Sequence, residues 1–469
     1  MTDQDQDQNQ KQDQDVVITG MGVVTPNAGS VESFWEANLT GRSGLSYERR
    51  MDLSQLPCGW VAGIIPDGIK KSVEERAGAP GRSWVDMLLH ATVDEALRDA
   101  RVEGPLDRPA GLLWSRVSPG PSGTFPEDYV AYMKTVAARY KELGDDRAAT
   151  LERLRAERAE RTNRSATDPS EPSEATTFPH SLAQRLGTPL ITMGLEATCA
   201  GGLRAIAEAA RLLRTGRIGL AVVAASVSRN THYVLSQYGQ LMALSRWKGA
   251  AEQASMPFDS RRSGMVINES SAALVLETAE HARRRGVDTV HAVIDGWGLA
   301  VDISHVTAPR IDTVERVVRG ALAHAGVSPD DIDTVNAHGT STRLNDITEA
   351  RALHRVFGKR MKEIDVCAVK SLTGHGSAAS GVVESTVAAL TLCRGVVPPV
   401  VTCTEPDPKC DVKTSLHPVE RPVDTVLKNS FGFGGQYASM VFRRPPNPRR
   451  APAASGAEHA GAEHAGAEH

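Results

Sequence analysis

One cysteine stands where the sequence could build a nucleophile. Cys199 lies in LEATCAGGLRA, after the strand-like residues ITMG and just before an amphipathic helix. The dipole and the unpaired amides of a helix N-terminus lower the pKa of a thiol, and Ala200, Gly201 and Gly202 leave room for a substrate carbonyl beside backbone N–H donors. This segment alone is equally consistent with a nucleophile elbow and with a buried structural thiol.

Two histidines lie in polar turns flanked by glycine. His338 ends a strand-like run in VNAHGTST, and His375 lies in VKSLTGHGSAASG, five residues after Lys370. A lone histidine is more often a hydrogen-bonded structural residue, but these sequences are poor core sequences and fit loops that contact a polar ligand. The segment FGFGG, at 431–435, reads as a flexible loop with two aromatic side chains, which is unusual for a mere turn.

Strands and helices must position these segments, and they alternate twice along the chain. Apolar runs and 3.6-residue periodicity predict strands at 111–115, 218–226, 271–278, 289–300 and 333–339, and helices at 31–40, 84–100, 313–326, 346–358 and directly after Cys199. This alternation predicts two α/β halves in a layered fold.

The first strand-like run argues against a dinucleotide site. Residues 16–18 predict a buried strand that runs into a turn at Gly20 and Gly22. The third glycine of the dinucleotide fingerprint is replaced by Thr25, and Pro26 interrupts the helix that the fingerprint requires.

Composition narrows the functional class. The net charge of −4 over 469 residues predicts neither nucleic-acid nor membrane binding, and no apolar run approaches the length of a membrane span. The N-terminus has no apolar segment typical of a signal peptide. The six cysteines form no CxxC pair, so reduced thiols in a cytoplasmic protein are the simplest interpretation.

The order of the motifs carries more information than any one of them. TCAGG is followed by PFDSRRSGMVINESSA, NAHGTST-x-LND, K-x-x-x-GH and NSFGFGG. From about Val16 to Phe442, this order resembles the β-ketoacyl-acyl-carrier-protein synthases, the elongating condensing enzymes of fatty-acid and type II polyketide assembly. The resemblance implies a thiolase fold, a five-layered αβαβα sandwich of two similar halves, and a homodimer or a heterodimer with a related subunit.

The resemblance also implies roles for particular residues. Cys199 would accept the acyl chain from an acyl carrier protein, and His338 and His375 would donate hydrogen bonds to the thioester carbonyl of a malonyl-type extender. Lys370 and its partner Glu384 would hold the orientation and protonation of the histidines. The backbone N–H groups of Cys199 and Phe433 would form the oxyanion hole. The remaining matches are Thr307, Thr340 and Thr342, on the phosphopantetheine arm, and Tyr238 and Phe433, on the acyl pocket and its gate.

No metal and no separate cofactor are expected, because neutral imidazoles can donate these hydrogen bonds unaided and the substrates travel on the carrier's phosphopantetheine.

Several residues depart from the family pattern. They are Met242, Asn268, Arg343, the Gly376–Ser377 pair after GH, and Gln436 and Tyr437 in GGQY. Several are expected near the tunnel or its entrance, where the loss of bulk at 376–377 would widen a cavity and Tyr238 adds a hydroxyl. They favour polyketide or specialised lipid biosynthesis over housekeeping fatty-acid synthesis.

Three functions remain open at this point. The first is decarboxylative Claisen condensation by an active ketosynthase. The second is a non-catalytic partner subunit that shapes the tunnel of a heterodimer, although such subunits lack the cysteine. The third is an acyltransferase that passes the chain on without decarboxylation, which the intact pair of histidines disfavours.

The organisation along the chain follows from composition and pattern. We expect disordered tails at 1–15 and 446–469, an N-terminal ketosynthase half at 16–285 and a C-terminal half at 286–445. A charged insertion at about 140–178 carries arginines that would steer an acidic carrier protein, or else it is a solvated decoration.

Overall fold

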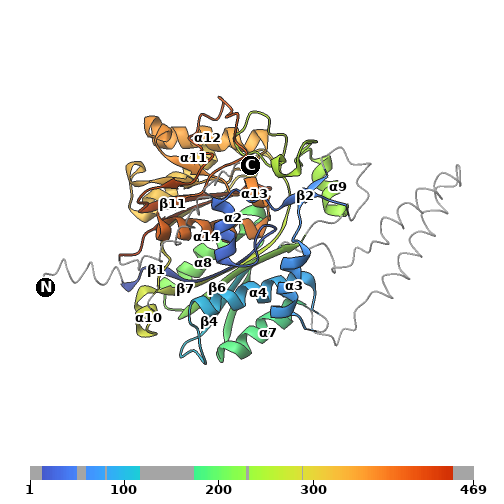
Figure 1. The fold of residues 1–469 in the computed structure, drawn as a ribbon. Helices are drawn as coiled ribbons and strands as arrows, with labels where there is room; N and C mark the ends of the chain where they lie inside the picture. Colours follow the sequence, from blue (N-terminus) through green and yellow to red (C-terminus); the bar gives the residue numbers. More distant parts are fainter. Residues whose placement is uncertain are drawn as a thin grey trace, which may run out of the picture.

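A ten-stranded mixed sheet runs through the molecule (Figure 1). The computed structural model describes residues 13–49, 60–79, 82–116, 174–228, 232–287 and 289–446. The predicted tails, apart from a few residues next to the body, and the charged insertion as far as residue 173 lie outside this part of the chain.

The two ends of the sheet are built from the two halves of the sequence in the same strand order. The first half contributes β1 (Val16–Val24), β7 (Glu269–Thr278), β6 (Leu220–Ser228), β4 (Ala110–Arg116) and β5 (Leu190–Gly194), in that spatial order. The second contributes β8 (Ala292–Val301), β14 (Gln436–Arg443), β13 (Thr425–Gly432), β9 (Thr334–Asn336) and β10 (Asp365–Cys367). In both, the first two pairings are antiparallel and the next two parallel.

Helices cover the two outer faces and fill the space between the halves. The first half adds α4 (Trp84–Asp99), α7 (Glu174–Leu186) and α8 (Gly201–Arg214), and the second adds α11 (Ile311–Ala325), α12 (Arg343–Phe357) and α14 (Ala378–Arg394). α8 and α14 pack against each other and against strands of both halves, whereas α4 and α11 lie on opposite outer faces (Figure 1). The result is the predicted five-layered αβαβα sandwich, with its largest core cluster around α8 and α14.

Smaller elements complete the fold around the sheet. They are α2 (Val31–Leu39), α3 (Asp67–Ala77), α9 (His232–Gln240), α10 (Ala279–Arg284), α13 (Lys370–Thr373), and the two-stranded pairs β2 (Leu45–Tyr47) with β3 (Val61–Gly63) and β11 (Val396–Val397) with β12 (Val419–Glu420). Within the described residues, none of the helices is long and apolar enough to cross a membrane.

The turn predicted at Gly20 and Gly22 is wrong, because β1 continues through both glycines. The nearest atom that a Cβ at Gly20 would meet is the Ala96 carbonyl oxygen of α4 at 2.1 Å, and at Gly22 it is the Thr92 oxygen at 2.0 Å. Likewise, a Cβ at Gly298 of β8 would lie 2.0 Å from the Val317 oxygen of α11. These glycines therefore let an outer helix lie directly on the strand.

Two further segments differ from their sequence-based description. Phe431 and Gly432 belong to β13, so only 433–435 forms the turn of the β13–β14 hairpin. The end of the predicted insertion is helical, since α7 begins at Glu174. Phe178, a residue of α7, is buried in the core.

Candidate active site

Cys199 lies in a tight turn between β5 and α8. The turn is a short 3-10 helix, Thr198–Ala200, and leaves Cys199 only 8% exposed. Thr198 has φ +46°, a left-handed conformation that a β-branched residue rarely adopts. Its hydroxyl donates to the Phe433 carbonyl at 3.0 Å, which ties the turn to the β13–β14 hairpin. The strained residue thus directly precedes the cysteine, as in a nucleophile elbow.

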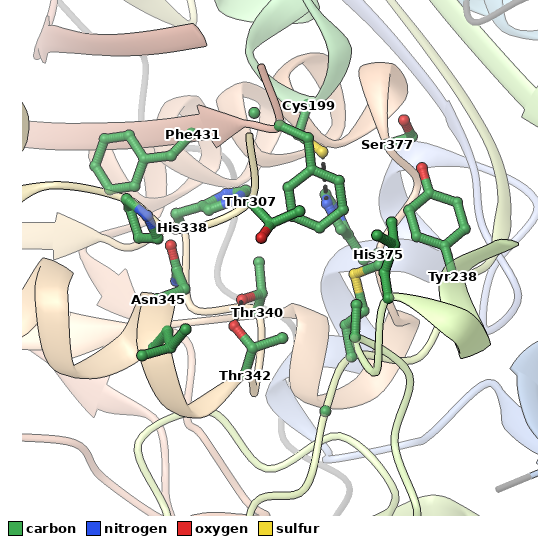
Figure 2. Close-up of a pocket in the computed structure, with 18 of the residues that line it drawn as sticks. Cys199, Tyr238, Thr307, His338, Thr340, Thr342, Asn345, His375, Ser377 and Phe431 are labelled. Atoms are coloured by element: carbon green, nitrogen blue, oxygen red, sulfur yellow. Dashed lines mark hydrogen bonds between the residues drawn. The ribbon is translucent and has the colours of Figure 1, made fainter. Parts of the chain in front are cut away.

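The two histidines approach Cys199 from the second half of the chain (Figure 2). His338 follows β9, and His375 lies between α13 and α14. The His375 Nε2 atom is 3.0 Å from the Cys199 Sγ atom, and the centroids of the two imidazole rings are 5.4 Å apart. The fold therefore brings together three residues that are separated by up to 176 positions in the chain.

Burial keeps both imidazoles neutral. The pKa values of His338 and His375 lie well below the ordinary value, first because both rings are removed from water and then because Lys370 is nearby. The Nδ1 atom of His338 is buried without a hydrogen-bond partner among the described residues. A neutral imidazole carries one N–H donor, so each ring can serve as a donor without first losing a proton.

The expectation of a lowered cysteine pKa is wrong. Burial raises the pKa of the Cys199 thiol to about 11, and this effect outweighs the opposing influence of the Lys370 charge. The Ser377 hydroxyl and the Phe433 backbone N–H also contact the sulfur and favour the thiolate. The helix N-terminus is thus not sufficient to activate this thiol, because desolvation costs the thiolate more.

Lys370 and Glu384 lie behind the histidines instead of lining the cavity. The Lys370 Nζ atom donates to the His338 carbonyl at 2.7 Å and forms a buried ion pair with Glu384. The other Glu384 oxygen pairs with Lys428 at 2.6 Å. Sequence reasoning missed Lys428, although a lysine in the strand-like TVLKNS is a signal, since a lysine is rarely buried without a partner.

A second missed carboxylate fixes the turn that carries His338. Glu349 of α12 is fully buried and accepts from the backbone N–H groups of His338 and Gly339 at 2.8 and 2.9 Å. Asn429 donates to it at 3.1 Å. Its burial raises its pKa, and these donors oppose the rise. The sequence offered only a weak signal, a glutamate on the apolar side of a predicted helix.

One cavity of about 480 Å³ collects most of the predicted residues. Its lining includes residues predicted for catalysis or for substrate binding: Cys199, Tyr238, Thr307, His338, Thr340, Thr342, His375 and Phe433. The rings of Tyr238 and Phe433 lie 6.0 Å apart. The Thr340 and Thr342 hydroxyls, which lie side by side in Figure 2, are 2.9 Å apart. Met242, Asn268, Arg343, Ser377 and Tyr437, which depart from the family pattern, also line the cavity.

The predicted widening at 376 is wrong. A Cβ at Gly376 would lie 2.2 Å from the Ser270 Oγ atom and 2.7 Å from the Asn268 Oδ1 atom. Asn268 is itself fixed by its bond to the Thr373 carbonyl at 2.8 Å. The small residue at 376 therefore accommodates the larger one at 268, and only Ser377 of the pair faces the cavity.

The glycines after Cys199 do not leave room for a substrate, contrary to the sequence-based expectation. A Cβ at Gly201 would lie 1.9 Å from the Ser115 Oγ atom, and one at Gly202 would lie 2.8 Å from the Val382 nitrogen of α14. Neither glycine lines the cavity. They allow α8 to pack closely on β4 and α14, and this packing sets the position of Cys199 relative to His375.

The described residues contain no group of three or more His, Cys, Asp or Glu side chains that could hold a metal ion.

Two family models match the chain. The model of the β-ketoacyl synthase N-terminal domain matches residues 13–80 and 135–282, and the model of the C-terminal domain matches residues 291–404. Together they span more than half of the chain.

Relatives align over nearly the whole chain. "Putative polyketide beta-ketoacyl synthase 1" of Streptomyces cyaneus is 31% identical and aligns over 93% of this chain and 99% of its own length. 3-oxoacyl-[acyl-carrier-protein] synthase 2 of Coxiella burnetii is 28% identical and aligns over 92% of this chain and 98% of its own length.

Two solved structures share the architecture. They are the ishigamide ketosynthase/chain length factor, with a TM-score of 0.75, and a type II PKS acyl-carrier protein in complex with its ketosynthase bound to the hexaketide, with a TM-score of 0.73. Each is 26% identical, and each comparison covers 92% of this chain and 99% of the other.

Proposed function

The chain belongs to the β-ketoacyl synthase family of acyl-transferring condensing enzymes, and we propose that it joins an acyl chain held on Cys199 to a malonyl-type extender carried by an acyl carrier protein. The observation that carries the proposal is the cavity in which Cys199 and two neutral histidines meet.

Acyl transfer to Cys199 is the first step. The thiolate forms a bond to the thioester carbonyl carbon, the carbon–sulfur bond to phosphopantetheine breaks, and the carrier thiol leaves with the proton that Cys199 gave up. The oxyanion hole consists of the backbone N–H groups of Cys199 and Phe433. Its support is the close approach of the hairpin, where a Cβ at Gly432 would lie 3.0 Å from the Cys199 nitrogen.

Decarboxylation and carbon–carbon bond formation follow. The malonyl carboxylate leaves as CO₂, and the electron pair of the broken bond forms an enolate whose oxygen accepts from His338 and His375. The enolate carbon attacks the acyl–Cys199 carbonyl, and the carbon–sulfur bond breaks to return the thiolate. Donors placed where the charge develops stabilise the transition state more than the substrate.

The buried ion pairs orient this site. Lys370, through the His338 carbonyl, and Glu384, through Lys370, fix the backbone that carries one of the two donors. The positive charges of Lys370 and Lys428 also lower the pKa values of both imidazoles and so keep the rings neutral.

The two sides of the cavity take different parts of the substrate. Thr307, Thr340 and Thr342 line the route of the phosphopantetheine arm, and Tyr238 and Phe433 line the acyl pocket. No metal or separate cofactor takes part, because the substrates arrive as phosphopantetheine thioesters. The units that build the cavity are the halves at 16–285 and 286–445.

We assign the enzyme to polyketide or specialised lipid biosynthesis in the cytoplasm. The polyketide synthase among its relatives and the departures that line the cavity support this pathway, and the free thiols among the described cysteines support a reducing compartment. Its partners are an acyl carrier protein and a second subunit, either a copy of itself or a relative. A tunnel-shaping subunit without catalysis, or a transferase without decarboxylation, fits less well because Cys199 and both histidines are present.

Intact-mass analysis tests the proposal. Wild-type protein incubated with acyl-carrier thioesters should gain one acyl group, and Cys199→Ala should gain none. Malonyl-carrier protein should then discharge the acyl group from wild type as the condensed product. His338→Ala should still acylate, but its decarboxylation should be slower by a factor of about 10² to 10³, as for one lost oxyanion donor. An acyl adduct on Cys199→Ala, or equal loss of both activities in His338→Ala, would contradict the assignment.

A further inference from the structure

Ser380, in the first turn of α14, holds the side of the His375 ring that faces away from Cys199. Its Oγ atom lies 2.9 Å from the His375 Nδ1 atom and 2.9 Å from the Gly376 backbone nitrogen. Ser380 is 3% exposed and His375 is 4% exposed, so water does not compete for these contacts.

The number of available protons decides the direction of the Ser380–His375 bond. A backbone N–H can only donate, so Gly376 donates to the Ser380 oxygen. The hydroxyl keeps one proton of its own, and a buried hydroxyl proton without an acceptor is costly. In the part of the chain that the structure describes, the His375 Nδ1 atom is the acceptor within hydrogen-bond distance. The Ser380 O–H therefore donates to Nδ1.

A neutral imidazole has one ring proton, and if Nδ1 accepts, that proton is on Nε2. We infer that Ser380 is a positioning residue that fixes His375 as the Nε2–H tautomer and so aims its only N–H donor at Cys199. The Nε2 atom is the one that lies 3.0 Å from the Cys199 sulfur.

The tautomer has a chemical consequence. An Nε2–H group donates to a thiolate or to a carbonyl oxygen, whereas the opposite tautomer would present a lone pair that accepts a hydrogen bond from the neutral thiol. His375 then acts as a donor to the sulfur and to the developing enolate oxygen, and not as the base that deprotonates Cys199. The part of the inference that concerns the enolate rests on the proposed function. The part that concerns the Cys199 thiol does not depend on it.

The two histidines differ in the hydrogen bonding of their Nδ1 atoms. The Nδ1 atom of His338 has no hydrogen-bond partner among the described residues, whereas both ring nitrogens of His375 are engaged. We expect a tautomer fixed by a hydroxyl at His375 alone.

Alkylation of Cys199 by iodoacetamide tests the inference without any carrier protein or thioester. The rate follows the thiolate fraction and is read by peptide mass spectrometry between about pH 7.5 and 9.5. In Ser380→Ala the imidazole is free to present its lone pair, so the thiolate loses a donor and its apparent pKa rises. We expect alkylation about tenfold slower at each pH, which corresponds to about one pKa unit.

Two variants separate positioning from packing. Ser380→Thr keeps a hydroxyl and should alkylate near the wild-type rate. Ser385→Ala removes another buried hydroxyl of α14, one that donates to the Gly381 carbonyl at 2.7 Å and does not contact His375, and should also resemble wild type. A wild-type rate in Ser380→Ala, or equal slowing in Ser380→Ala and Ser380→Thr, would overturn the inference.

A direct measurement of the tautomer covers the case in which a variant does not fold. In protein labelled with ¹⁵N-histidine, the His375 resonances are identified by their loss in His375→Gln. We expect an unprotonated Nδ1 and a protonated Nε2, and a protonated Nδ1 would overturn the inference. Because neither measurement uses turnover, failure of the enzyme to condense would count against the proposed function alone.

Discussion

At the scale of single residues, the candidate active site combines neutral imidazoles with buried cations. His338 and His375 are surrounded by Lys370 and Lys428, and Glu384 pairs with both lysines. Removing one member of such a network leaves an uncompensated buried charge, which typically costs several kcal/mol. The arrangement keeps two donors uncharged beside Cys199, at the expense of a thiol that burial makes harder to ionise.

These histidines should make stability depend on pH. In the folded state both pKa values lie well below 6.5, whereas in the unfolded chain both rings titrate near the ordinary value. Below about pH 6.5 the unfolded state therefore binds more protons, so stability is retained above that pH and lost as the pH falls. Each ring contributes a slope of up to about 1.4 kcal/mol per pH unit.

Urea unfolding of wild type and of a His338→Asn/His375→Asn double variant between about pH 7 and 5 measures this contribution. The unfolding free energy of the double variant should fall less steeply with decreasing pH. Identical slopes would contradict the prediction, whatever the difference in absolute stability.

At the scale of elements, the contact between α8 and α14 sets the distance between Cys199 and His375. Cys199 directly precedes α8, and His375 lies just before α14. Gly202 and Gly381 meet where the two helices cross, and a Cβ at Gly202 would come within 3.0 Å of the Gly381 Cα atom. The packing of these two helices therefore determines how accurately Cys199 and His375 are placed relative to each other.

Gly202→Ala should separate the two helices. The added methyl group has no space, so we expect a loss of about 1–3 kcal/mol in unfolding free energy and a slower alkylation of Cys199. Gly68→Ala in α3 is a matched control, since a Cβ there meets nothing within 4 Å and alanine favours a helix by up to about 1 kcal/mol. Chemical denaturation and alkylation rates check both variants, and equal behaviour of the two would disprove the crossing argument.

At the scale of the whole molecule, the two halves share one core. β1 and β8 join the two parts of the sheet through three residue pairs, and the largest apolar cluster contains side chains from strands of both halves. The cavity at Cys199 is likewise lined by residues of both. Neither half can bury its inner face without the other.

We therefore expect the halves to unfold in one transition. Five of the six tryptophans precede residue 286, so in Trp297→Phe the indole fluorescence reports on the first half, while far-UV circular dichroism reports on both. Thermal or urea unfolding followed by the two signals should coincide. Separate midpoints would show that the halves are independent.

The sequence by itself determined the fold and proposed the main residues of the candidate site. Strand and helix periodicity predicted two similar halves, and the order of TCAGG, NAHGTST, K-x-x-x-GH and NSFGFGG pointed to Cys199, His338 and His375, all of which line one cavity. Such local patterns depend on which residues a strand, turn or helix needs. They can therefore be recognised without knowing which segment packs against them.

Only the tertiary structure decided what depends on distant neighbours. Burial raises the pKa of Cys199, and Gly202 serves helix packing instead of substrate space. Lys428, Glu349 and Ser380 became visible only when the fold placed them beside Glu384, the His338 turn and the His375 ring. Desolvation, close approach and hydrogen-bond direction are properties of pairs of segments, and one segment of sequence does not specify its partner.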